Sequence, residues 1–425
     1  MRKQLGRPSG SCHHDQMNAK TTCAVVGGGP AGMVLGLLLA RAGVEVTVLE
    51  KHADFLRDFR GDTVHPTTLR LIDELGLWPK FSALPHSRLE RATVDVGAGR
   101  TITVVDFGRL RQPHPYIAMV PQWDLLNLLA EAGEAEPTFT LRMCTEATGL
   151  IREGGRVVGV RYQDPDGPGE LRADLTVGCD GRGSVLRGLA GLQVREFPVS
   201  FDAWWFRLPR PADDSIYTLV PRIAPGKAMI VIPREGYLQI AMLIPKGTDA
   251  ERRARGLDAF RADVLALLPE AATTIETITS LDDVKHLDVR LNRLRRWHTD
   301  GLLFIGDAAH AMSPAGGVGI NVAIQDAVAT ARLLADPLRR GAVTERDLAA
   351  VRRRRVVPAA LTQALQRQID KRFLRPILDG DVTGPPPALV RAIERAPWLT
   401  FVPAYLVGVG VRPERAPEFA KRRPT

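Results

Sequence analysis

The residues of this sequence that suit phosphate binding and redox chemistry lie in glycine-rich turns and beside isolated carboxylates. Gly27-x-Gly29-x-x-Gly32 follows an apolar run, and Asp180-Gly181 and Gly306-Asp307 each follow another. Glycine lets the backbone turn sharply and approach an anion, and a carboxylate accepts hydrogen bonds from sugar hydroxyls. These patterns predict a nucleotide-type cofactor. No side chain is assigned as a nucleophile, so the catalytic residues stay unknown.

The first glycine motif belongs to a complete βαβ pattern over residues 22–50. Gly27 permits the tight turn, Gly29 lets the backbone approach a pyrophosphate, and Gly32 lets the following helix lie close to the strand. The N-terminus of that helix attracts anions. Glu50 ends the second strand roughly 20 residues beyond the turn, where it would bind a ribose and repel a 2′-phosphate. The unit predicts an FAD- or NAD-type adenosine site.

A second glycine-rich segment follows the strand that ends at Gly306-Asp307. Residues 314–321 lead into a long helical pattern through Ala323, Ile324, Ala327 and Leu333. Backbone N–H groups at such a helix start point outward, so a second phosphate- or carbonyl-binding turn is expected here. Arg60, at the start of another helical pattern, is either a phosphate clamp or a surface arginine capped by Asp62.

Composition sets limits on partners and location. The formal net charge is +9, but the arginines are spread along the chain and no aromatic-interleaved basic patch is present, so no nucleic-acid partner is expected. The four cysteines form no C-x-x-C pair and no metal-ligand spacing, which indicates no metal site and a cytoplasmic protein with reduced thiols. We see no apolar run of about 18 residues and expect no transmembrane segment.

The three motifs, in this order, resemble the single-component FAD-dependent monooxygenases of the p-hydroxybenzoate hydroxylase family. The resemblance covers about residues 22–375, and the Arg-Gly-Asp-Thr-Val-His-Pro stretch at 60–66 is similar to that of actinobacterial-type FAD-dependent oxidoreductases. It implies an α/β fold with a Rossmann-like FAD-binding domain, an interleaved β-sheet substrate domain and a helical C-terminal region. A natural-product substrate is implied too.

The domain limits follow from this resemblance and the change of pattern along the chain. We expect a disordered leader at 1–20, an FAD-binding domain at 21–195 and 296–345, a substrate-binding β-sheet domain at 196–295 to which 85–120 contribute, and a C-terminal helical region at 346–425. Aromatic and polar residues of the substrate segment are pocket candidates, or core instead: Trp204, Trp205, Phe206, Tyr217, Tyr237 and Gln239.

The resemblance also implies the reaction. NADH or NADPH would reduce FAD, O2 would react at flavin C4a to give a hydroperoxide, and a small aromatic or polycyclic molecule would be hydroxylated or epoxidised. Backbone N–H groups of 317–321 would stabilise charge on the reduced flavin, with Pro314 and Gly317 as the candidate reactive loop. The implied cofactor-binding residues are Gly27, Gly29, Pro30, Ala31, Gly32, Glu50, Lys51, Arg60, Gln122, Ala147, Asp180, Asp307, Pro314, Gly317, Gly319, Ile320 and Asn321.

Several points stay open at this stage. Ser313 stands where the family has the first proline of a pair, and Arg187 either serves the cofactor or only ties its helix down. A reductase or dehydrogenase of the same superfamily is an alternative, as are an FAD-binding regulator and a flavin halogenase, for which 204–209 only partly match the Trp-x-Trp-x-Ile-Pro mark. The apolar tail at 398–407 suggests packing on the body or a homodimer.

Overall fold

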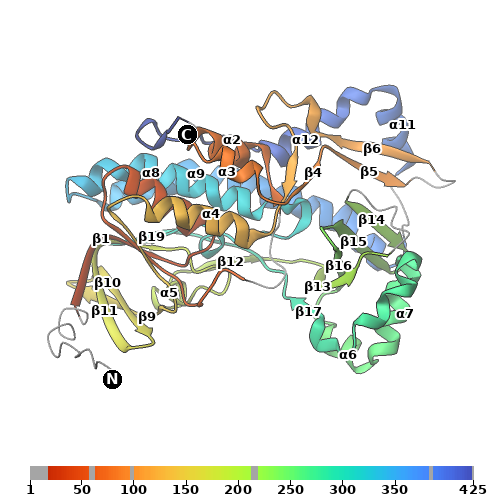
Figure 1. Ribbon diagram of the computed structural model, residues 1–425, viewed down its shortest axis with the longest axis horizontal. Helices are drawn as coiled ribbons and strands as arrows, with labels where there is room; N and C mark the ends of the chain where they lie inside the picture. The colour runs from red at the N-terminus through yellow and green to blue at the C-terminus, as the bar shows by residue number, and fades with distance from the viewer. Residues whose placement is uncertain (1–17, 57–62, 96–99, 212–218, 382–385, 424–425) are drawn as a thin grey trace, which may run out of the picture.

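The protein has a large sheet at one end and a smaller one at the other, joined by two long helices that run between them (Figure 1). The structure is a computed structural model that describes residues 18–56, 63–95, 100–211, 219–381 and 386–423. The long helices are α8 (Gly319–Arg339) and α9 (Glu345–Ile369).

The large sheet confirms the predicted βαβ unit. Its strands run in the order β19-β20-β11-β1-β2-β8, and β11, β1, β2, β8 and β20 are parallel. Residues Cys23–Val26 of β1 are buried on both faces, as expected of a parallel sheet covered by helices. The bounds are β1 Asn18–Val26, β2 Val46–Leu49, β8 Phe139–Arg142, β9 Glu146–Glu153, β10 Arg156–Asp164, β11 Gly167–Gly178, β19 His298–Thr299 and β20 Leu302–Phe304.

Two expectations about this sheet were wrong. Residues 18–20 are not part of a disordered leader, because Asn18–Lys20 pair in register with Glu170–Arg172 of β11. The alternating patterns at 139–143, 157–162 and 171–177 predict an antiparallel meander, but β8 pairs in parallel with β2, and only β9, β10 and β11 form the meander. In this position the Phe139 ring of β8 fills the space that Gly36 and Gly133 leave beside it.

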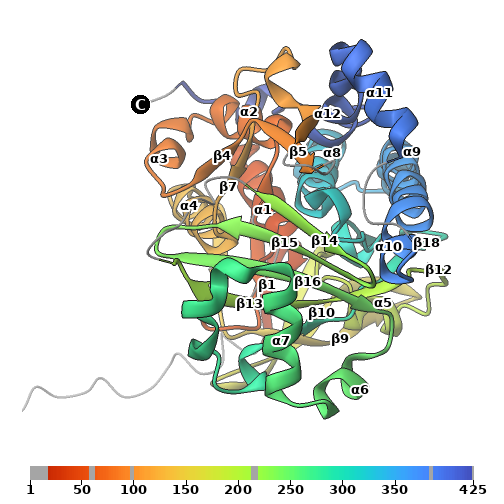
Figure 2. The same ribbon diagram turned by 90° about the vertical axis from the view of Figure 1, so that its right-hand side faces the viewer.

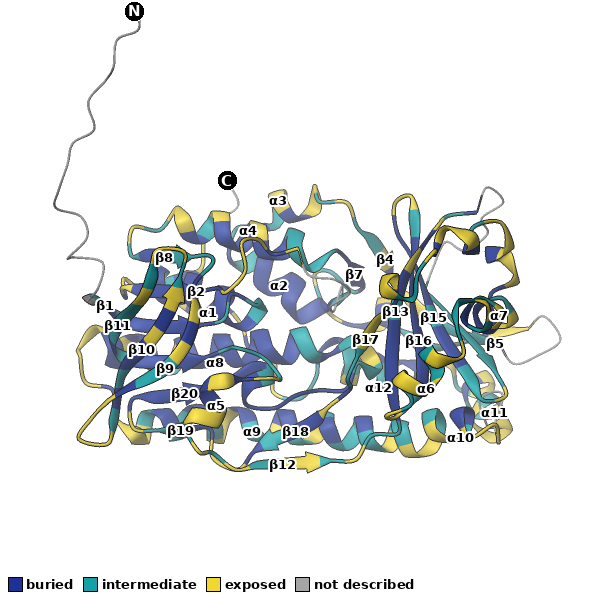
Figure 3. Cartoon of the chain, turned by 90° about the horizontal axis from the view of Figure 1, so that it is seen from below, coloured by how far each residue is buried: buried dark blue, intermediate teal, exposed yellow. Residues whose placement is uncertain are grey.

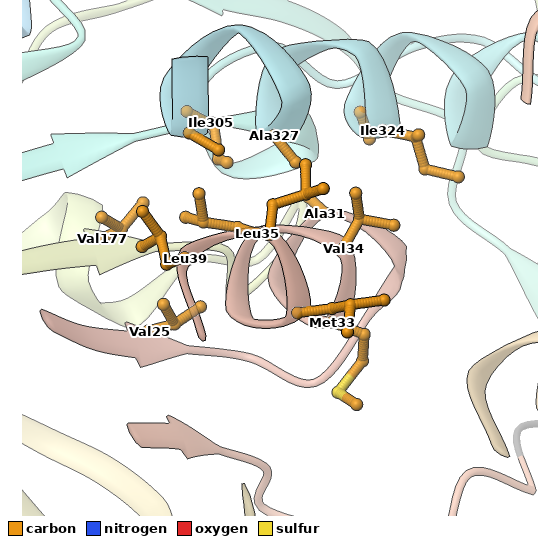
Figure 4. Close-up of a cluster of buried hydrophobic side chains, with 14 of the residues drawn as sticks. Val25, Ala31, Met33, Val34, Leu35, Leu39, Val177, Ile305, Ile324 and Ala327 are labelled. Atoms are coloured by element: carbon orange, nitrogen blue, oxygen red, sulfur yellow. The ribbon is translucent and has the colours of Figure 1, made fainter. Parts of the chain in front are cut away.

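The core of the cofactor-binding part lies between α1 (Pro30–Arg41) and α8. Residues 31–40 of α1 are all buried, because the sheet covers one side of the helix and other helices cover the rest. Figure 4 shows Ala31, Val34 and Leu35 of α1 beside Ile324 and Ala327 of α8. The small side chains of Ala31 and Ala327 lie at this contact and let the two helices approach closely.

One helical span, Ala315–Arg339, is long and apolar enough to cross a membrane by length and composition alone. This differs from the expectation that the sequence has no such run. The reason is its alanine-rich inner face, and 78% of the apolar window is buried inside the fold. Figure 3 shows α8 as largely buried between its neighbours.

The second sheet has the order β14-β15-β16-β13-β17, and all of its pairings are antiparallel. Helices α6 (Asp249–Ala254) and α7 (Leu257–Leu267) cover its outer face, as Figure 2 shows. Trp204 and Phe206 pack on Phe260 of α7, so both are core residues of this layer. The strands are β13 Phe201–Pro209, β14 Val220–Ala224, β15 Lys227–Pro233, β16 Tyr237–Pro245 and β17 Lys285–Leu287; Tyr217 lies outside the described residues.

The expectation that 85–120 contribute strands to this sheet was wrong. The alternating patterns at 91–96 and 101–105 predict a hairpin, which is present as β5 (Arg91–Asp95) with β6 (Thr101–Asp106), although its turn lies outside the described residues. Within the same segment, β4 (Ser87–Leu89) pairs with β7 (Ile117–Met119), and β7 also pairs with β3 (Thr63–Val64). In the described part of the chain, the segment forms no other strand pairs. Leu89, Leu110 and Met119 instead pack on the inner face of the second sheet, and so cover this sheet without extending it.

The remaining helices complete the body. The short ribbon of β12 (Val194–Phe197) and β18 (Leu291–Leu294) joins the two halves. At the C-terminus, α12 buries Ala404 in the cluster under the second sheet, but Trp398 and Val402 are 62% and 47% exposed. The predicted packing on the body is confirmed for one face. The helix bounds are α2 Pro66–Glu74, α3 Trp78–Ser82, α4 Gln122–Glu134, α5 Val185–Leu189, α10 Arg375–Leu378, α11 Pro387–Arg395 and α12 Phe401–Gly408.

Candidate functional site

The glycine turn has the geometry of a cradle. Gly27 has a φ of +108°, and a Cβ added there would lie 2.5 Å from the Cys179 carbonyl oxygen. A Cβ on Gly32 would lie 1.9 Å from the Gly27 oxygen, which confirms the close packing of helix on turn. A Cβ on Gly29 would meet no atom within 4 Å in the part of the chain that the structure describes. The open position is therefore the one at which a pyrophosphate was expected, at the N-terminus of α1.

Glu50 ends β2 directly beside this turn. Its carboxylate accepts hydrogen bonds from the Gly28 N–H at 2.9 Å and from the His52 N–H at 3.0 Å, and the residue is 5% exposed. The Thr145 N–H donates to the Glu50 carbonyl at 2.8 Å, and the neighbouring Lys51 and Glu146 are 3.7 Å apart. The start of β9, which includes Ala147, thus lies beside the end of β2.

The Gly306-Asp307 motif lies beside the glycine turn at the start of α1. A Cβ added to it would lie 3.2 Å from the Cβ atoms of both Ala31 in α1 and Ala323 in α8. The adjacent Asp307 side chain is 28% exposed, and its Oδ2 is 3.5 Å from Arg182 Nη2. The starts of α1 and α8 therefore flank the turn that carries Asp307.

The Asp180 motif is packed against this turn. Burial raises the pKa of Asp180, although its Oδ2 accepts a hydrogen bond from the Leu186 N–H at 3.2 Å. Among the described residues Asp180 Oδ1 and Arg182 Nη1 are buried without a hydrogen-bond partner. Arg187 donates to the carbonyls of Ala308 (3.3 Å) and Arg182 (2.8 Å). The structure thus favours the anchoring role for Arg187.

A buried charge network behind Gly306 was not predicted. Asp326 of α8, which is fully buried, lies 2.5 Å from His310 Nε2 and 2.9 Å from Arg355 Nε, and its Oδ2 accepts from the Gly306 N–H at 3.1 Å. Burial alone would raise the pKa of Asp326, but His310 and Arg355 hold it below its usual value. The available signal was a carboxylate within the apolar stripe that contains Ala323 and Ala327.

The loop that precedes α8 departs from its expected role in one respect. The Gly317 N–H donates to the Pro314 carbonyl at 2.9 Å, so this donor is used within the loop. Gly317 has a φ of +63°, and a Cβ there would lie 2.6 Å from Thr63 Oγ1. Enlarging Gly317 would therefore strain the loop against β3, so its effect could not be assigned to a cofactor contact alone.

The first turn of α8 keeps its expected donors. The N–H groups of Gly319, Ile320 and Asn321 belong to the helix start, where no intrahelical acceptor exists. The buried Asn321 Oδ1 accepts from the hydroxyls of Thr67 and Thr68 at 2.8 and 2.6 Å, which joins the start of α2 to the start of α8. Three helix N-termini, those of α1, α2 and α8, are thereby fixed around one region.

The outcome for the other predicted residues is mixed. Pro30 occupies the first position of α1, and Gln122 begins α4, whose next residue, Trp123, is 5.8 Å from the Arg207 guanidinium of the second sheet. Arg60 lies outside the described residues. In the described ranges no group of three metal-ligating side chains is present. Burial raises the pKa of Cys23 to about 12 and that of Cys179 well above its ordinary value, which favours the protonated thiols over the nucleophilic thiolates.

Comparisons with known proteins agree with this geometry. Residues 20–365 match the family model described as the FAD binding domain. The 6-methylpretetramide 4-monooxygenase of Streptomyces rimosus is 37% identical over 344 residues, 79% of this chain and 80% of that protein. The rifampicin monooxygenase of Streptomyces venezuelae is 31% identical over 329 residues, but these cover only 61% of its length and 71% of this chain.

A solved structure shares the fold. The OxyS anhydrotetracycline hydroxylase from Streptomyces rimosus superimposes with a TM-score of 0.71 over 94% of this chain and 78% of its own, at 24% identity. At that identity the likeness concerns the fold alone. It includes the arrangement of two sheets joined by long helices.

Proposed function

We propose a reaction for this chain, which belongs to the FAD binding domain family and is related to flavin-dependent monooxygenases. It hydroxylates or epoxidises an aromatic or polycyclic small molecule with NADH or NADPH and O2. A role in natural-product metabolism follows from the same relatives. One observation carries the proposal: the starts of α1 and α8 and the Gly306-Asp307 turn meet at one place.

The residues present fit FAD. Gly29 leaves open the position that a pyrophosphate would take, and Asp180 Oδ1 and Arg182 Nη1 are buried polar atoms that lack a partner in the described protein. Glu50 would hold the adenosine ribose and Asp307 the ribityl chain. When bound, FAD supplies hydride acceptance from NAD(P)H and oxygen activation. The first-turn N–H groups of α8 would stabilise negative charge on the reduced ring.

The substrate would bind against the inner face of the second sheet. Trp205 and Ile230 belong to one apolar cluster with Val407, and a Cβ on Gly316 of the loop would lie 3.9 Å from the Val407 side chain. The cluster therefore connects the loop to the sheet. Trp205 Nε1 is buried without a partner in the described residues, and Gln239 is 2% exposed. An apolar face with few polar atoms suits a flat aromatic molecule that carries few oxygens.

Turnover with a defined probe tests the proposal. The purified protein should be yellow, release FAD on acid precipitation, and consume NADH or NADPH and labelled O2 with 6-methylpretetramide, giving a product heavier by one labelled oxygen atom. NAD(P)H oxidation without oxygen uptake would indicate a reductase. Chloride-dependent product would indicate a halogenase. We do not expect one, because Trp204 and Phe206 of the partly matching Trp-x-Trp-x-Ile-Pro stretch are both core residues. A homodimer and a cytoplasmic location stay predictions.

Asp307 offers a test of the cofactor assignment. Asp307→Ala should weaken FAD binding by about 1.5–3 kcal/mol, because one charge-assisted hydrogen bond to the ribityl chain is lost. The partly exposed Asp307 contributes only a 3.5 Å contact to Arg182, so the fold should persist. FAD titration of the apoprotein measures the effect, with Asp300→Ala, a surface carboxylate paired with Arg156, as control. Equal affinity in both variants would refute the ribityl assignment.

A further inference from the structure

A glutamine of α9 fixes the loop that precedes α8. Gln366 is 3% exposed, and its Oε1 accepts a hydrogen bond from the Ser313 N–H at 3.1 Å. Its Nε2 donates to the carbonyls of Ser313 at 2.7 Å and Ala315 at 3.0 Å. One side-chain amide thus engages both backbone groups of Ser313 and one of Ala315, and so determines the path of the loop on both sides of Pro314.

This bracing lies at Ser313, the position where the family has the first proline of a pair. Proline restricts the backbone by locking φ, whereas a serine at the same place leaves the backbone free to rotate. The Ser313 hydroxyl adds only one bond, from the Ala315 N–H at 3.3 Å. The three Gln366 bonds therefore supply from a neighbouring helix the restraint that Ser313 lacks.

The brace belongs to a buried polar stripe on α9. Gln363, three residues before Gln366 and on the same face, donates from Nε2 to the carbonyls of Asn292 at 2.7 Å and Ala311 at 3.1 Å. It accepts at Oε1 from Arg293. Gln363 therefore makes the same kind of contact one step upstream, to the segment before the loop, which makes it a matched control.

The opposite side of the loop is held independently. The Gly317 carbonyl accepts from Thr63 Oγ1 at 2.8 Å and lies 3.0 Å from His65 Nε2, while His65 Nδ1 lies 2.8 Å from the Val407 carbonyl. The loop is thus anchored at Gly317 by β3 and the residue before α2. Gln366 is the anchor at its other end, so removing it frees Ser313–Pro314 without unfolding the rest.

We infer that Gln366 is a positioning residue for the flavin ring, because it fixes the Ser313–Gly317 loop in the position in which the loop would support the ring. The inference rests on the proposed placement of this loop beside the isoalloxazine. Productive geometry tolerates displacements of only about 0.5 Å, so a freed loop would loosen the ring and admit water. Oxygen activated in a wetter site is lost as hydrogen peroxide.

The test compares Gln366→Met with Gln363→Met in the FAD-loaded full chain. Methionine keeps the length and approximate volume of the side chain but removes its amide. For Gln366→Met we expect faster amide hydrogen exchange at 311–318, an altered visible spectrum of bound flavin, and an FAD dissociation constant on the order of tenfold higher. Gln363→Met should speed exchange at 289–311 and leave the flavin spectrum unchanged.

Further arms separate the possible failures. Should Gln366→Met not fold, Gln366→Glu keeps the acceptor for the Ser313 N–H and loses both donors, so it should show the same spectral change. A third variant, Pro314→Gly, alters the loop directly. If Pro314→Gly perturbs the flavin spectrum and Gln366→Met does not, the positioning role is overturned while the loop placement stands. Native spectra in both variants would overturn the loop placement, and with it the inference.

Discussion

Replacing Gly29 by valine will leave the apoprotein folded and remove its ability to bind FAD. Gly29 is the N-cap of α1 with φ −74° and ψ −177°, an extended conformation that any residue adopts. A Cβ there meets no atom of the described residues within 4 Å, so the side chain would project into the space assigned to the pyrophosphate. Loss of the close backbone approach should abolish measurable FAD binding, because the phosphate cannot reach the N–H groups of the helix start.

Two further glycines make this result interpretable. Gly32→Val should destroy the fold itself, because its Cβ would lie 1.9 Å from the Gly27 oxygen. Gly188→Val in α5 also enters open space and should keep its FAD. FAD titration and thermal unfolding of the three apoproteins give the comparison. A folded Gly29→Val protein that binds FAD normally would show that the pyrophosphate lies elsewhere.

The parts of the site that the sequence predicted are those that depend on local geometry. Each of three features places a characteristic residue type at the end of a buried strand, where that type has few other roles. They are the glycine turn, Glu50 and the Gly306-Asp307 turn. Spacing along the chain is enough to recognise them. The structure adds that Gly306 lies between Ala31 and Ala323, a contact that joins segments almost 300 residues apart and has no local signal.

The parts that were missed depend on which residue faces which across the fold. Trp204 and Trp205 are adjacent in β13, and only pairing and layering place Trp204 against α7 and Trp205 on the inner face. A shift by one residue would exchange their roles. Gln366 likewise lies in an arginine- and glutamine-rich helix whose composition suggests a solvated surface, and its role emerges only from the bonds to Ser313 and Ala315.

The largest effect on stability should come from Asp326. Asp326→Ala removes the acceptor of His310, Arg355 and the Gly306 N–H together, and leaves the guanidinium of Arg355, 2% exposed, without its main counter-charge. Breaking a buried ion pair in this way costs about 3–5 kcal/mol of unfolding free energy. The Gly306-Asp307 turn also loses its anchor, so FAD binding should weaken alongside. Urea unfolding of the apoprotein at pH 7 measures the first effect.

Asp336→Ala on the same helix is the matched control, because Asp336 pairs with Arg339 at an exposed position and should contribute between about 0 and 1 kcal/mol. The double variant Asp326→Ala/Arg355→Met should recover part of the loss, since the uncompensated charge is gone. The pKa of Asp326 is held below its usual value in the folded state. Its contribution to the free energy of unfolding is therefore complete above its pKa in the unfolded chain, about 4, and is lost as the pH falls through its pKa in the folded protein. If Asp326→Ala costs no more than Asp336→Ala at pH 7, the network does not support the turn that carries Asp307.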